Sequence, residues 1–326
     1  MDQVKQENNK TYDVIIIGAG PAGLTASIYA SRYKLTNLVI GKQLGGELSL
    51  AHKVENYPGF VSISGLDLTA KWKQQAEVLG AKVILKEAGK IEKQQDQFLI
   101  EINETEKYQA RTVIVTTGSE RRRLNIPGEK DYLGKGISYC YTCDSPFFKD
   151  KTVALIGGSD SAVSGAVHTA EYASKVFIIY RQDKLRAEPI WIEEWQRLEQ
   201  QGKGITIYNT NITEILGDGT KVTGIKLDKP YHNQDTINLD GVFIEIGGVP
   251  RTTLVQPLGI ELDETSHVKV SENMETNING LFCAGDMVDK SRVMKQAITA
   301  MAQGAIAAAS AYKFIKKQAA PQIRGI

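Results

Sequence analysis

Two stretches of the chain repeat the same order of apolar and polar positions. The stretch 12–33 begins with an unbroken aliphatic run, passes through a glycine-rich turn and continues with a segment of helical periodicity. The stretch 152–172 repeats this order, and a further short apolar run follows each stretch, at 37–40 and at 176–179. Short, fully apolar runs are typical of buried parallel strands, so the pattern predicts two β-α-β units.

The rest of the chain supplies strands and one long helix. Residues 82–115 alternate apolar and polar positions, which predicts a small antiparallel meander. Residues 205–246 hold further strand-like segments, broken by the turn sequence Gly217-Asp218-Gly219. The stretch 291–317 is rich in alanine and has helical periodicity. These segments would complete two mixed α/β domains around the two β-α-β units.

The chain of 326 residues exceeds the usual size of one domain. We expect an α/β fold with two Rossmann-like, three-layer ββα dinucleotide-binding domains. Glycine-containing joints near 117–118 and 247–248 are the expected crossing points. Residues 1–118 and 248–326 would then form one discontinuous domain, and residues 119–247 would form the other.

Composition and charge narrow the function classes. Lys and Arg number 39 against 38 Asp and Glu, so no excess of positive charge is available for a nucleic acid. No apolar run approaches the roughly 20 residues that span a bilayer. The polar stretch 1–10 lacks the apolar core of a signal peptide. We therefore expect a cytoplasmic protein that binds neither nucleic acid nor membrane.

The turn after the first strand matches a dinucleotide-binding motif. Gly18-Ala19-Gly20-Pro21-Ala22-Gly23 fits G-x-G-x-x-G between a strand and a helix. In this motif the first glycine permits a tight turn, the second lets a pyrophosphate approach the backbone, and the third lets the helix pack on the strand. The helix N-terminus then offers free N–H groups to the phosphates. Gly18, Gly20, Pro21, Ala22 and Gly23 are therefore candidate cofactor-binding residues.

Two of the three cysteines form the motif Cys140-x-x-Cys143. A zinc site would need a second pair of ligands at similar spacing, which the third cysteine and the four histidines do not provide. We expect no metal site and favour a dithiol that cycles to a disulfide. Asp144 follows directly and is either a proton carrier for thiolate chemistry or an ordinary surface or helix-capping residue.

Together with further motifs in the same order, these residues resemble the low-molecular-weight thioredoxin reductases, from about Tyr12 to Ala311. Each motif has a counterpart in that family. In chain order they are Gly18–Gly23 (the FAD motif), Gly45-Gly46-Glu47-Leu48 (G-G-Q-L), Glu55-Asn56-Tyr57-Pro58-Gly59 (E-N-(W/Y)-P-G), Thr116-Thr117-Gly118 (A-T-G), Cys140–Asp144 (C-A-T-C-D), Gly280–Asp286 (the late flavin motif) and Lys295-Gln296-Ala297 (R-Q-A).

The resemblance implies a homodimeric FAD enzyme that reduces thioredoxin or a thioredoxin-like protein. Cys143 would face the flavin, Cys140 would attack the partner disulfide, and Asp144 would donate a proton. The nicotinamide domain would rotate about its two linkers between the two half-reactions. The residues expected to contact FAD are Gly18, Gly20, Pro21, Ala22, Gly23, Gly45, Gly46, Glu47, Leu48, Asn56, Thr117, Gly118, Gly285, Asp286, Lys295, Gln296 and Ala297.

The second nucleotide motif departs from the family pattern. It reads Gly157-Gly158-Ser159-Asp160-Ser161-Ala162, with Ser159 in place of the middle glycine. The basic motif H-R-R-x-x-x-R reads Tyr180 to Arg186, with Gln182 in place of one arginine. NADPH remains the expected donor, because two arginines are retained. Its expected contacts are Gly157, Gly158, Ser159, Asp160, Ser161, Arg181 and Arg186.

These departures leave two alternatives open. One is a related flavoprotein that takes electrons from ferredoxin or another donor, or passes them to oxygen as a dithiol oxidase. Asp144 counts against an oxidase, since the oxidases of this group tend to carry His at that position. The other is a flavin-binding redox sensor without turnover, which the intact thiol pair disfavours. On the flavin side, Glu47 replaces Gln and Lys295 replaces Arg. The run Arg121–Arg123 is interpreted as a solvated face.

Overall fold

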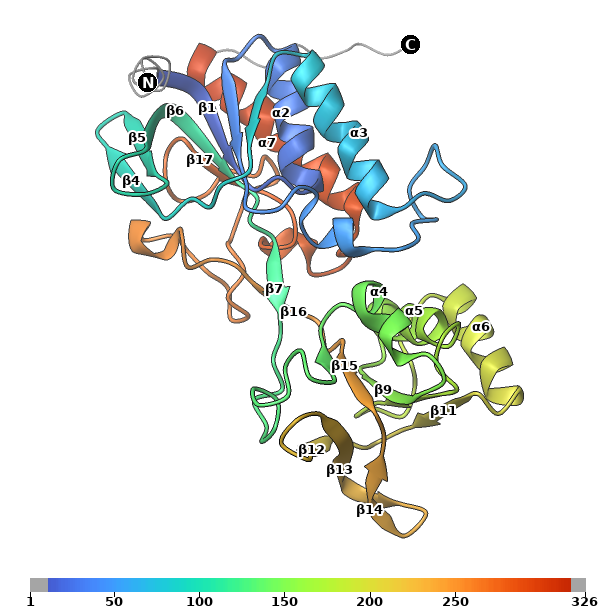
Figure 1. Cartoon of the computed structure of the whole chain (residues 1–326). Coiled ribbons are helices and arrows are strands. Elements are labelled where there is room, and N and C mark those ends of the chain that lie inside the picture. The colour runs from blue at the N-terminus through green and yellow to red at the C-terminus, as the bar shows by residue number, and fades with distance from the viewer. Residues whose placement is uncertain (1–10, 318–326) are drawn as a thin grey trace. The chain divides into compact units, whose positions relative to one another are not determined.

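The structure is a computed structural model that describes residues 11–317 (Figure 1). The polar stretch 1–10, for which a terminus without a signal peptide is expected, lies outside the described residues. The chain divides into two compact units. One unit comprises the residues up to Glu120 together with those from Val249 onward, and the other comprises Arg121–Gly248. No helix among residues 11–317 is long and apolar enough to cross a membrane.

The first unit is built on a seven-stranded sheet. In spatial order its strands are β3 (Lys82–Ile84), β2 (Asn37–Ile40), β1 (Thr11–Ile17), β6 (Lys107–Val115), β5 (Gln97–Glu101) and β4 (Lys90–Gln94), and β17 (Leu281–Cys283) also pairs with β6. The pairs β1–β2, β1–β6, β2–β3 and β6–β17 are parallel. Only β4, β5 and β6 form an antiparallel meander. The meander predicted for 82–115 is therefore wrong for β3, which a helical crossover carries to the parallel edge of the sheet.

The α-helices in the described part of this unit are α2 (Pro21–Arg32), α3 (Gly65–Val78) and α7 (Ala297–Lys316). The helices α2 and α7 lie against each other beside the sheet (Figure 1). Their backbones approach so closely that a Cβ added to Gly304 would overlap the carbonyl group of Ala22. The predicted helix 291–317 begins only at Ala297, because the Gln296 and Thr299 side chains form a capping box there. Residues 289–291 form a short 3₁₀ turn, η4.

The second unit contains a five-stranded parallel sheet. In spatial order its strands are β11 (Gly204–Ile207), β10 (Lys175–Ile179), β9 (Thr152–Ile156), β15 (Gly241–Ile244) and β8 (Ile137–Ser138). A separate antiparallel sheet holds β12 (Ile212–Gly217), β13 (Val222–Tyr231) and β14 (Gln234–Asn238). The helices are α4 (Tyr141–Asp144), α5 (Asp160–Thr169) and α6 (Pro189–Gln200).

Alternate residues of the parallel strands face two different cores in this unit. Val153 and Leu155 pack with residues of α5 and α6, whereas Ala154 and Ile156 pack with residues of the antiparallel sheet. Because successive side chains of a strand point to opposite faces, an unbroken apolar run is the pattern of a strand covered on both sides. The unit therefore has three layers, and the predicted α/β fold with two Rossmann-like domains is confirmed.

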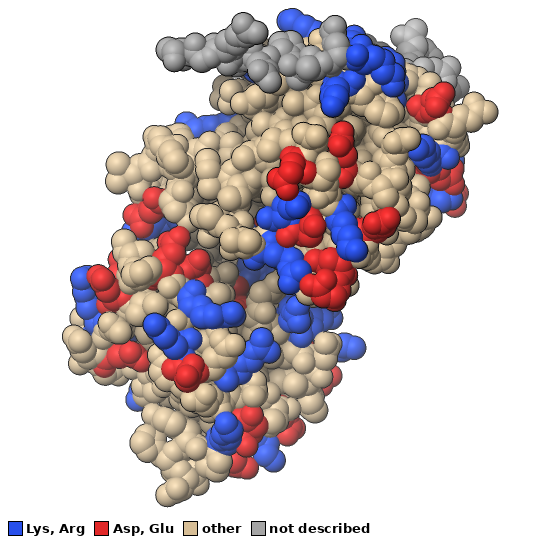
Figure 2. Space-filling model, turned by 180° about the vertical axis from the view of Figure 1, so that it is seen from behind, with Lys and Arg blue, Asp and Glu red and all other residues tan. Residues whose placement is uncertain are grey.

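Two short strands join the units. β7 (Ser119–Arg121) and β16 (Gly248–Pro250) pair with each other. Gly118 and Gly247, at their ends, have φ of +66° and +89°, a region that favours glycine. Arg121 forms an ion pair with Glu245, whose side chain is only 3% exposed, so the interpretation of Arg121 as part of a solvated face is wrong. On the face drawn in Figure 2, acidic and basic side chains are interspersed.

Candidate functional site

The first dinucleotide-binding motif, Gly18 to Gly23, folds as a tight strand-turn-helix connection between β1 and α2. Gly18 has φ of +117°, and a Cβ there would overlap the Thr116 backbone. A Cβ on Gly23 would overlap the carbonyl oxygen of Gly18. Gly20 differs, since its nearest neighbour to an added Cβ would be the Gly45 carbonyl oxygen, 3.9 Å away. Two glycines therefore serve packing, and Gly20 leaves room in front of the helix.

The start of α2 is open to an anion. Gly20 is the N-cap residue, and no side chain among the described residues caps the helix. Pro21 has no N–H group, so Ala22 and Gly23 carry the first amides of the helix. A helix N-terminus with free amides and an open space in front of it fits the pyrophosphate of a dinucleotide.

Two loops lie beside this turn. The Gly45 N–H donates to the Ala19 carbonyl oxygen at 2.7 Å, and a Cβ on Gly46 would lie 3.7 Å from the Gly20 Cα. Glu47 and Leu48 follow in the 3₁₀ helix η1 (Gly46–Leu50). The loop that carries Gly45 to Leu48 is thus held against the first dinucleotide-binding motif.

The loop that carries Asn56 reaches the start of α7. The Asn56 Nδ2 donates to the Gln296 Oε1 at 3.2 Å. Ala297, the first residue of α7, packs with the apolar cluster that includes Leu24 and Trp72. The predicted flavin residues at 56 and 295–297 are therefore neighbours in the fold, although they are far apart in the sequence.

The turn after β17 is fixed by two side chains that the sequence reasoning missed. The Gly285 N–H donates to the Gln303 Oε1 at 2.8 Å. The Ser291 Oγ donates to the Gly285 carbonyl oxygen at 2.8 Å and lies 3.0 Å from the Gln303 Oε1. A long polar side chain within the alanine-rich stretch 297–311 is the sequence signal that could have identified Gln303, which the structure shows to be buried.

Asp286, in this turn, has an unusual environment for a carboxyl group. Burial raises its pKa and so does the nearby Glu47, while Lys295 lowers it. Its carboxyl group makes no hydrogen bond to any described residue. A half-buried carboxyl group without a hydrogen-bond partner among residues 11–317 is suited to bind a ligand hydroxyl, which fits the ribityl chain expected from the resemblance. Thr117 differs, because its hydroxyl already donates to the Arg251 carbonyl oxygen at 2.7 Å.

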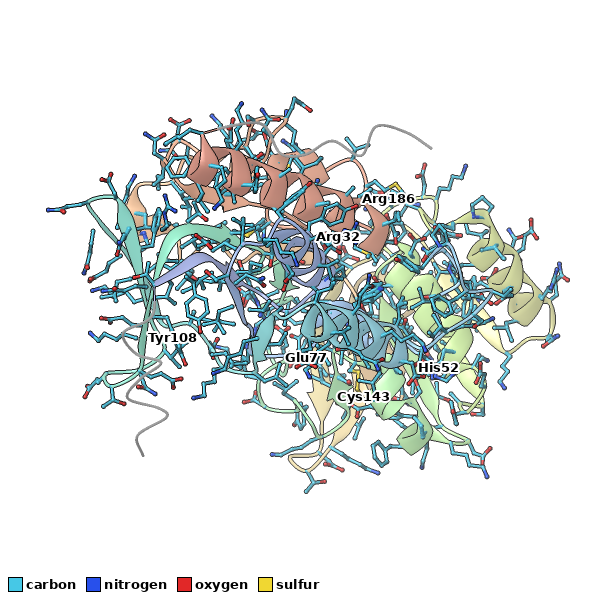
Figure 3. All side chains as sticks on the ribbon, turned by 90° about the horizontal axis from the view of Figure 1, so that it is seen from above. Arg32, His52, Glu77, Tyr108, Cys143 and Arg186 are labelled. Carbon is cyan, nitrogen blue, oxygen red and sulfur yellow. A yellow bond between two sulfur atoms is a disulfide. The ribbon has the colours of Figure 1, made fainter. Side chains whose placement is uncertain are left out.

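The two cysteines of the second unit form a disulfide. Cys140 and Cys143 have a Cα–Cα separation of 5.3 Å, and Figure 3 labels Cys143. Cys140 caps α4, and its Sγ accepts a hydrogen bond from the Cys143 N–H at 3.3 Å. The Cys140 N–H donates to the Ser138 Oγ at 2.9 Å. The loop therefore holds both sulfur atoms at bonding distance, with Cys143 exposed and Cys140 half-buried.

Asp144 lies directly after this pair and is half-buried. It occupies the N-cap position of the 3₁₀ helix η2 (Ser145–Phe148), but its side chain makes no capping hydrogen bond. Its backbone N–H donates to the Cys140 carbonyl oxygen at 3.1 Å. Asp144 is thus joined to the disulfide loop through its backbone, and its carboxylate does not cap the helix.

Tyrosines on each side of Cys140 anchor the disulfide loop, and the sequence reasoning assigned no role to either. The Tyr139 hydroxyl bonds to the buried Glu129 carboxylate, and burial together with this bond raises the Tyr139 pKa. The Tyr141 ring packs against α5, where a Cβ on Gly165 would lie 2.8 Å from it. The ring of His168 lies edge-on to the same tyrosine. The disulfide loop is therefore attached through Tyr141 to α5, the helix of the second nucleotide motif.

At the residue that starts its helix, the second nucleotide motif has the same backbone conformation as the first. Ser159, the N-cap of α5, has φ of −96° and ψ of −177°, and Gly20 has φ of −84° and ψ of −172°. A serine adopts this extended conformation without strain. The Ser159 side chain does not cap α5, so the amides of that helix start remain available to a phosphate. The departure at Ser159 changes the space in front of the helix and leaves its backbone unchanged.

The neighbouring residues Gly157, Asp160 and Ser161 take different positions. A Cβ on Gly157 would overlap the Glu245 carbonyl oxygen, as expected for a packing glycine. The Asp160 carboxylate accepts a hydrogen bond from the Glu188 N–H at 2.6 Å, which ties α5 to the start of α6. Ser161 is exposed on the first turn of α5.

The segment after β10 forms a small network over Gly158. The Tyr180 ring lies where a Cβ on Gly158 would be. Its hydroxyl donates to the Gln182 Oε1 and accepts from the Arg186 Nε, both at 2.8 Å. Arg186 is labelled in Figure 3, and both it and Arg181 are exposed. Gln182, which replaces an arginine of the family motif, therefore helps to orient Arg186.

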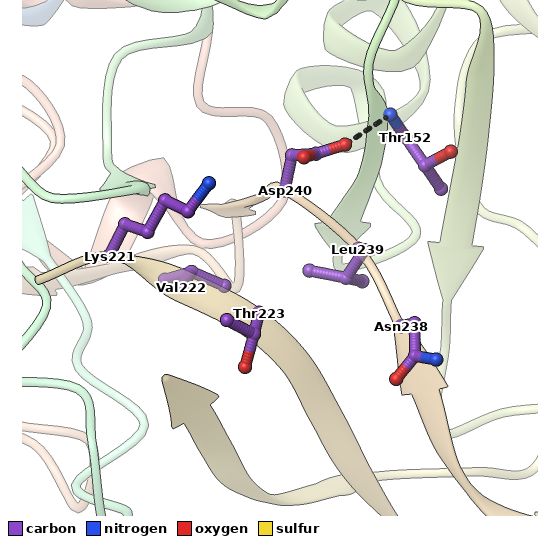
Figure 4. Close-up of a pocket in the computed structure, with 7 residues that line it drawn as sticks. All are labelled: Thr152, Lys221, Val222, Thr223, Asn238, Leu239 and Asp240. Atoms are coloured by element: carbon purple, nitrogen blue, oxygen red, sulfur yellow. Dashed lines mark hydrogen bonds between the residues drawn. The ribbon is translucent and has the colours of Figure 1, made fainter. Parts of the chain in front are cut away.

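A pocket of about 250 Å³ in the second unit lies away from this chemistry (Figure 4). It includes Thr152, the first residue of β9, and Asp240, which directly precedes β15. The Asp240 carboxylate accepts from the Thr152 N–H at 3.0 Å. Gly157 and Glu245 follow the opposite ends of the same strands, and dinucleotides bind at the carboxyl ends of parallel strands. The pocket is therefore not part of the candidate site.

Comparisons with known proteins agree with this geometry. Residues 12–304 match the model of the family described as pyridine nucleotide-disulphide oxidoreductase. A thioredoxin reductase of Listeria innocua is 41% identical over 312 residues, covering 94% of this chain and 95% of the relative. The crystal structure of Lactococcus lactis thioredoxin reductase matches with a TM-score of 0.88 at 35% identity, covering 94% of this chain and 100% of that one.

A third similar protein is the thioredoxin reductase of T. acidophilum. Its crystal structure matches with a TM-score of 0.86 at 37% identity, covering 94% of this chain and 99% of that one. The resemblance inferred from the motifs is thus confirmed over nearly the whole sequence. The chain belongs to the pyridine nucleotide-disulphide oxidoreductase family, within its thioredoxin reductase group.

Proposed function

We propose that the protein is a thioredoxin-disulfide reductase. The observation that carries the proposal is the Cys140–Cys143 disulfide, held beside the second nucleotide motif in a chain of this family. A C-x-x-C pair that opens and closes is the chemistry needed to pass two electrons to another disulfide.

We infer that FAD binds the domain expected at residues 1–118 and 248–326, and that NADPH binds the domain expected at 119–247. These bounds differ from those of the two compact units by no more than two residues. Three observations support the first assignment: the room at Gly20, the uncapped start of α2, and an Asp286 carboxyl group that makes no hydrogen bond within residues 11–317. When bound, FAD supplies the means to accept a hydride from a nicotinamide and return two electrons singly or together. The chain's residues then have to bind the cofactor, orient it and carry protons.

The thiol step is an exchange between the dithiol of this chain and the disulfide of thioredoxin. The Cys140 thiolate attacks one sulfur atom of the thioredoxin disulfide, which forms a mixed disulfide and releases the other thioredoxin sulfur as a thiolate. We infer that Asp144 supplies the proton that this thiolate takes up. The Cys143 thiolate then attacks the Cys140 sulfur atom, closes the Cys140–Cys143 disulfide and releases the second thioredoxin sulfur as a thiolate, which takes up the proton that Cys143 lost. Two thiols are oxidised in this chain and one disulfide is reduced in the partner.

NADPH is the proposed electron donor, in a homodimer located in the cytoplasm. The strain-free backbone at Ser159 and the oriented, exposed Arg186 support a nucleotide site that still works. Arg181 adds a second exposed cation beside it. A reducing compartment is where a dithiol reductase would operate.

An anaerobic titration tests the proposal. The FAD-loaded protein is titrated separately with NADPH and NADH while the oxidised-flavin absorbance is followed, and an oxidised thioredoxin is then added. We expect bleaching by NADPH and recovery of the absorbance as thioredoxin thiols form. Bleaching by dithionite alone would contradict the donor assignment. A flavin that is reduced by NADPH but not reoxidised by thioredoxin would contradict the partner.

Replacing Ser159 by glycine is expected to raise the affinity for NADPH about tenfold. The substitution removes a Cβ and a hydroxyl from the place where the pyrophosphate approaches α5, and the backbone there needs no change. Tryptophan fluorescence or flavin bleaching as a function of NADPH concentration measures the change. Ser174→Gly, at an exposed position before β10, is the matched control. An unchanged affinity in Ser159→Gly would show that the serine is already accommodated.

Replacing Arg186 by leucine is expected to weaken NADPH binding about 10- to 100-fold and to leave NADH binding unchanged. The 2′-phosphate is the only difference between the two nucleotides, and the oriented Arg186 guanidinium is suited to pair with it. Dissociation constants for both nucleotides give the comparison. Lys184→Leu removes the same charge two residues away. An equal loss in that control would indicate general electrostatic attraction and not a phosphate contact.

A further inference from the structure

A line of hydrogen bonds connects Lys295, in the proposed flavin site, with residues that the proposed function does not use. The Lys295 Nζ lies 3.1 Å from the His267 Nε2. On the other side of the imidazole ring, the His267 Nδ1 lies 2.7 Å from the Thr265 Oγ1. The side chain of His267 is only 8% exposed. The histidine is therefore held between a cation and a hydroxyl group.

The donors and acceptors along this line can point in one direction only. A lysine ammonium group has donors and no acceptor, so the His267 Nε2 must accept from it. The Nδ1 then carries the proton and donates to the Thr265 Oγ1. The Thr265 hydroxyl in turn donates to the Asp263 Oδ1 at 2.8 Å. This assignment requires a neutral imidazole, because a protonated one could not accept from Lys295.

Asp263 fixes the far end of the line. Its Oδ1 also accepts from the backbone N–H groups of Thr265 at 2.7 Å and of His267 at 3.0 Å. Its Oδ2 accepts from Arg292 at 3.2 Å. Burial opposes ionisation, but these hydrogen bonds hold the pKa of Asp263 at about 2. Asp263 is thus ionised near neutral pH, and it anchors the Thr265 hydroxyl and, through it, the imidazole ring.

Lys295, at the other end of this line, is one of the residues expected to contact FAD. Burial raises the pKa of Asp286, Lys295 lowers it and Glu47 raises it, so these three residues share one environment. Lysine carries a compact ammonium group where the family motif has the planar fork of arginine. A flexible lysine needs an acceptor to fix its direction, and the His267 Nε2 is such an acceptor.

We propose that His267 is a positioning residue for the flavin: its neutral imidazole holds the Lys295 ammonium group at the flavin site, and protonation of His267 releases it. The inference rests on the proposed function, since it requires FAD beside Lys295. A cation held there stabilises the negative charge of the reduced flavin. Its release at low pH would therefore make the flavin harder to reduce.

The charged groups around His267 agree with a neutral ring near neutral pH. Burial lowers its pKa, and the cations of Lys295 and Arg292 act in the same direction. Asp263 and Asp289 act in the opposite direction. The net shift is downward from the ordinary value, so the ring becomes protonated only in acidic solution. The contact with Lys295 would then be replaced by repulsion between two cations.

The flavin midpoint potential of the FAD-loaded protein tests the proposal, measured against a reference dye between pH 5.5 and pH 8. His267→Phe is expected to favour the oxidised flavin about tenfold at pH 7.5, a shift of about 30 mV for a two-electron couple. Lys295→Met should give the same shift, and the double variant should show no further change. His267→Gln can accept from Lys295 and donate to Thr265 without titrating, so it should keep the original potential and lose the deviation below pH 6.5.

A second readout does not depend on the flavin potential. The His267 pKa, followed by NMR, should rise in Lys295→Met because a neighbouring cation is removed. His232→Asn, at an exposed hairpin turn, is the control for both measurements. A His267→Phe protein that binds FAD, reduces thioredoxin and keeps the original potential would overturn this inference alone, as would an unchanged His267 pKa in Lys295→Met. A chain that takes up no FAD would overturn the proposed function and the inference together.

Discussion

Replacing Cys143 by serine is expected to stop turnover with thioredoxin and to trap the two proteins as a mixed disulfide. Cys140 retains its thiol and attacks the thioredoxin disulfide, but no second thiol remains to resolve the product. Cys140→Ser should be equally inactive and should form no adduct. The loss in each case is expected to be on the order of 10³-fold or more, because the two sulfur atoms act as one unit. Thioredoxin-thiol formation and non-reducing electrophoresis measure the two effects.

Cys283→Ala is the matched control for these two substitutions. Cys283 is the third cysteine of the sequence, it is fully buried, and burial raises its thiol pKa. A thiol of this kind takes no part in exchange. Its removal should leave both turnover and the flavin reduction by nucleotide unchanged. Full thioredoxin reduction by Cys140→Ser, or an adduct formed equally by both serine variants, would contradict the roles given to the two cysteines.

Replacing Gly20 by alanine is expected to lower the FAD affinity about 100-fold while the protein still folds. An added Cβ meets no protein atom closer than 3.9 Å, so it would project into the open space in front of α2. That space is where the pyrophosphate has to approach the helix amides. The flavin absorbance retained after purification and the FAD dissociation constant of the apoprotein give the result.

Gly23→Ala separates packing from binding in the same motif. A Cβ at this position would overlap the Gly18 carbonyl oxygen, so the chain must shift and the free energy of unfolding should fall by about 3 kcal/mol or more. Thermal unfolding without FAD should therefore show a lower midpoint for Gly23→Ala and an unchanged one for Gly20→Ala. Gly89→Ala, at an exposed position with ordinary contacts, serves as control. Normal FAD binding by Gly20→Ala would show that the pyrophosphate does not occupy that space.

The sequence predicted the architecture where one local pattern was sufficient. Fully apolar runs at 14–17 and 153–156 mark strands covered on both faces, and the glycine turns after them allow only a narrow set of connections. The prediction was wrong where contacts with other segments decide the structure. Lys82–Ile84 has too few residues to reveal whether it pairs with β2 or with a meander, and the sheet edge settles the matter. The start of α7 depends on a capping box that periodicity does not detect.

For the candidate site, the sequence identified the motif residues but not those that hold them. Gln303 fixes the Gly285 turn from a helix 18 positions later. Tyr141 joins the disulfide loop to α5, and Glu245 takes up the charge of Arg121 across 124 positions. Each of these contacts joins residues that are distant in the chain. No spacing rule connects them, because their side chains meet only after the sheets and helices have packed.

The sequence by itself determined the two nucleotide motifs, the redox pair and the family, since each depends on residues that are adjacent or a few positions apart. Only the tertiary structure decided which glycines are there for packing and which leaves space for a ligand. It also decided that Ser159 keeps the backbone of Gly20 and that His267 contacts Lys295. The physical reason is that steric room and hydrogen-bond partners are properties of atoms from several segments at once. They exist only when the folded chain brings those segments together.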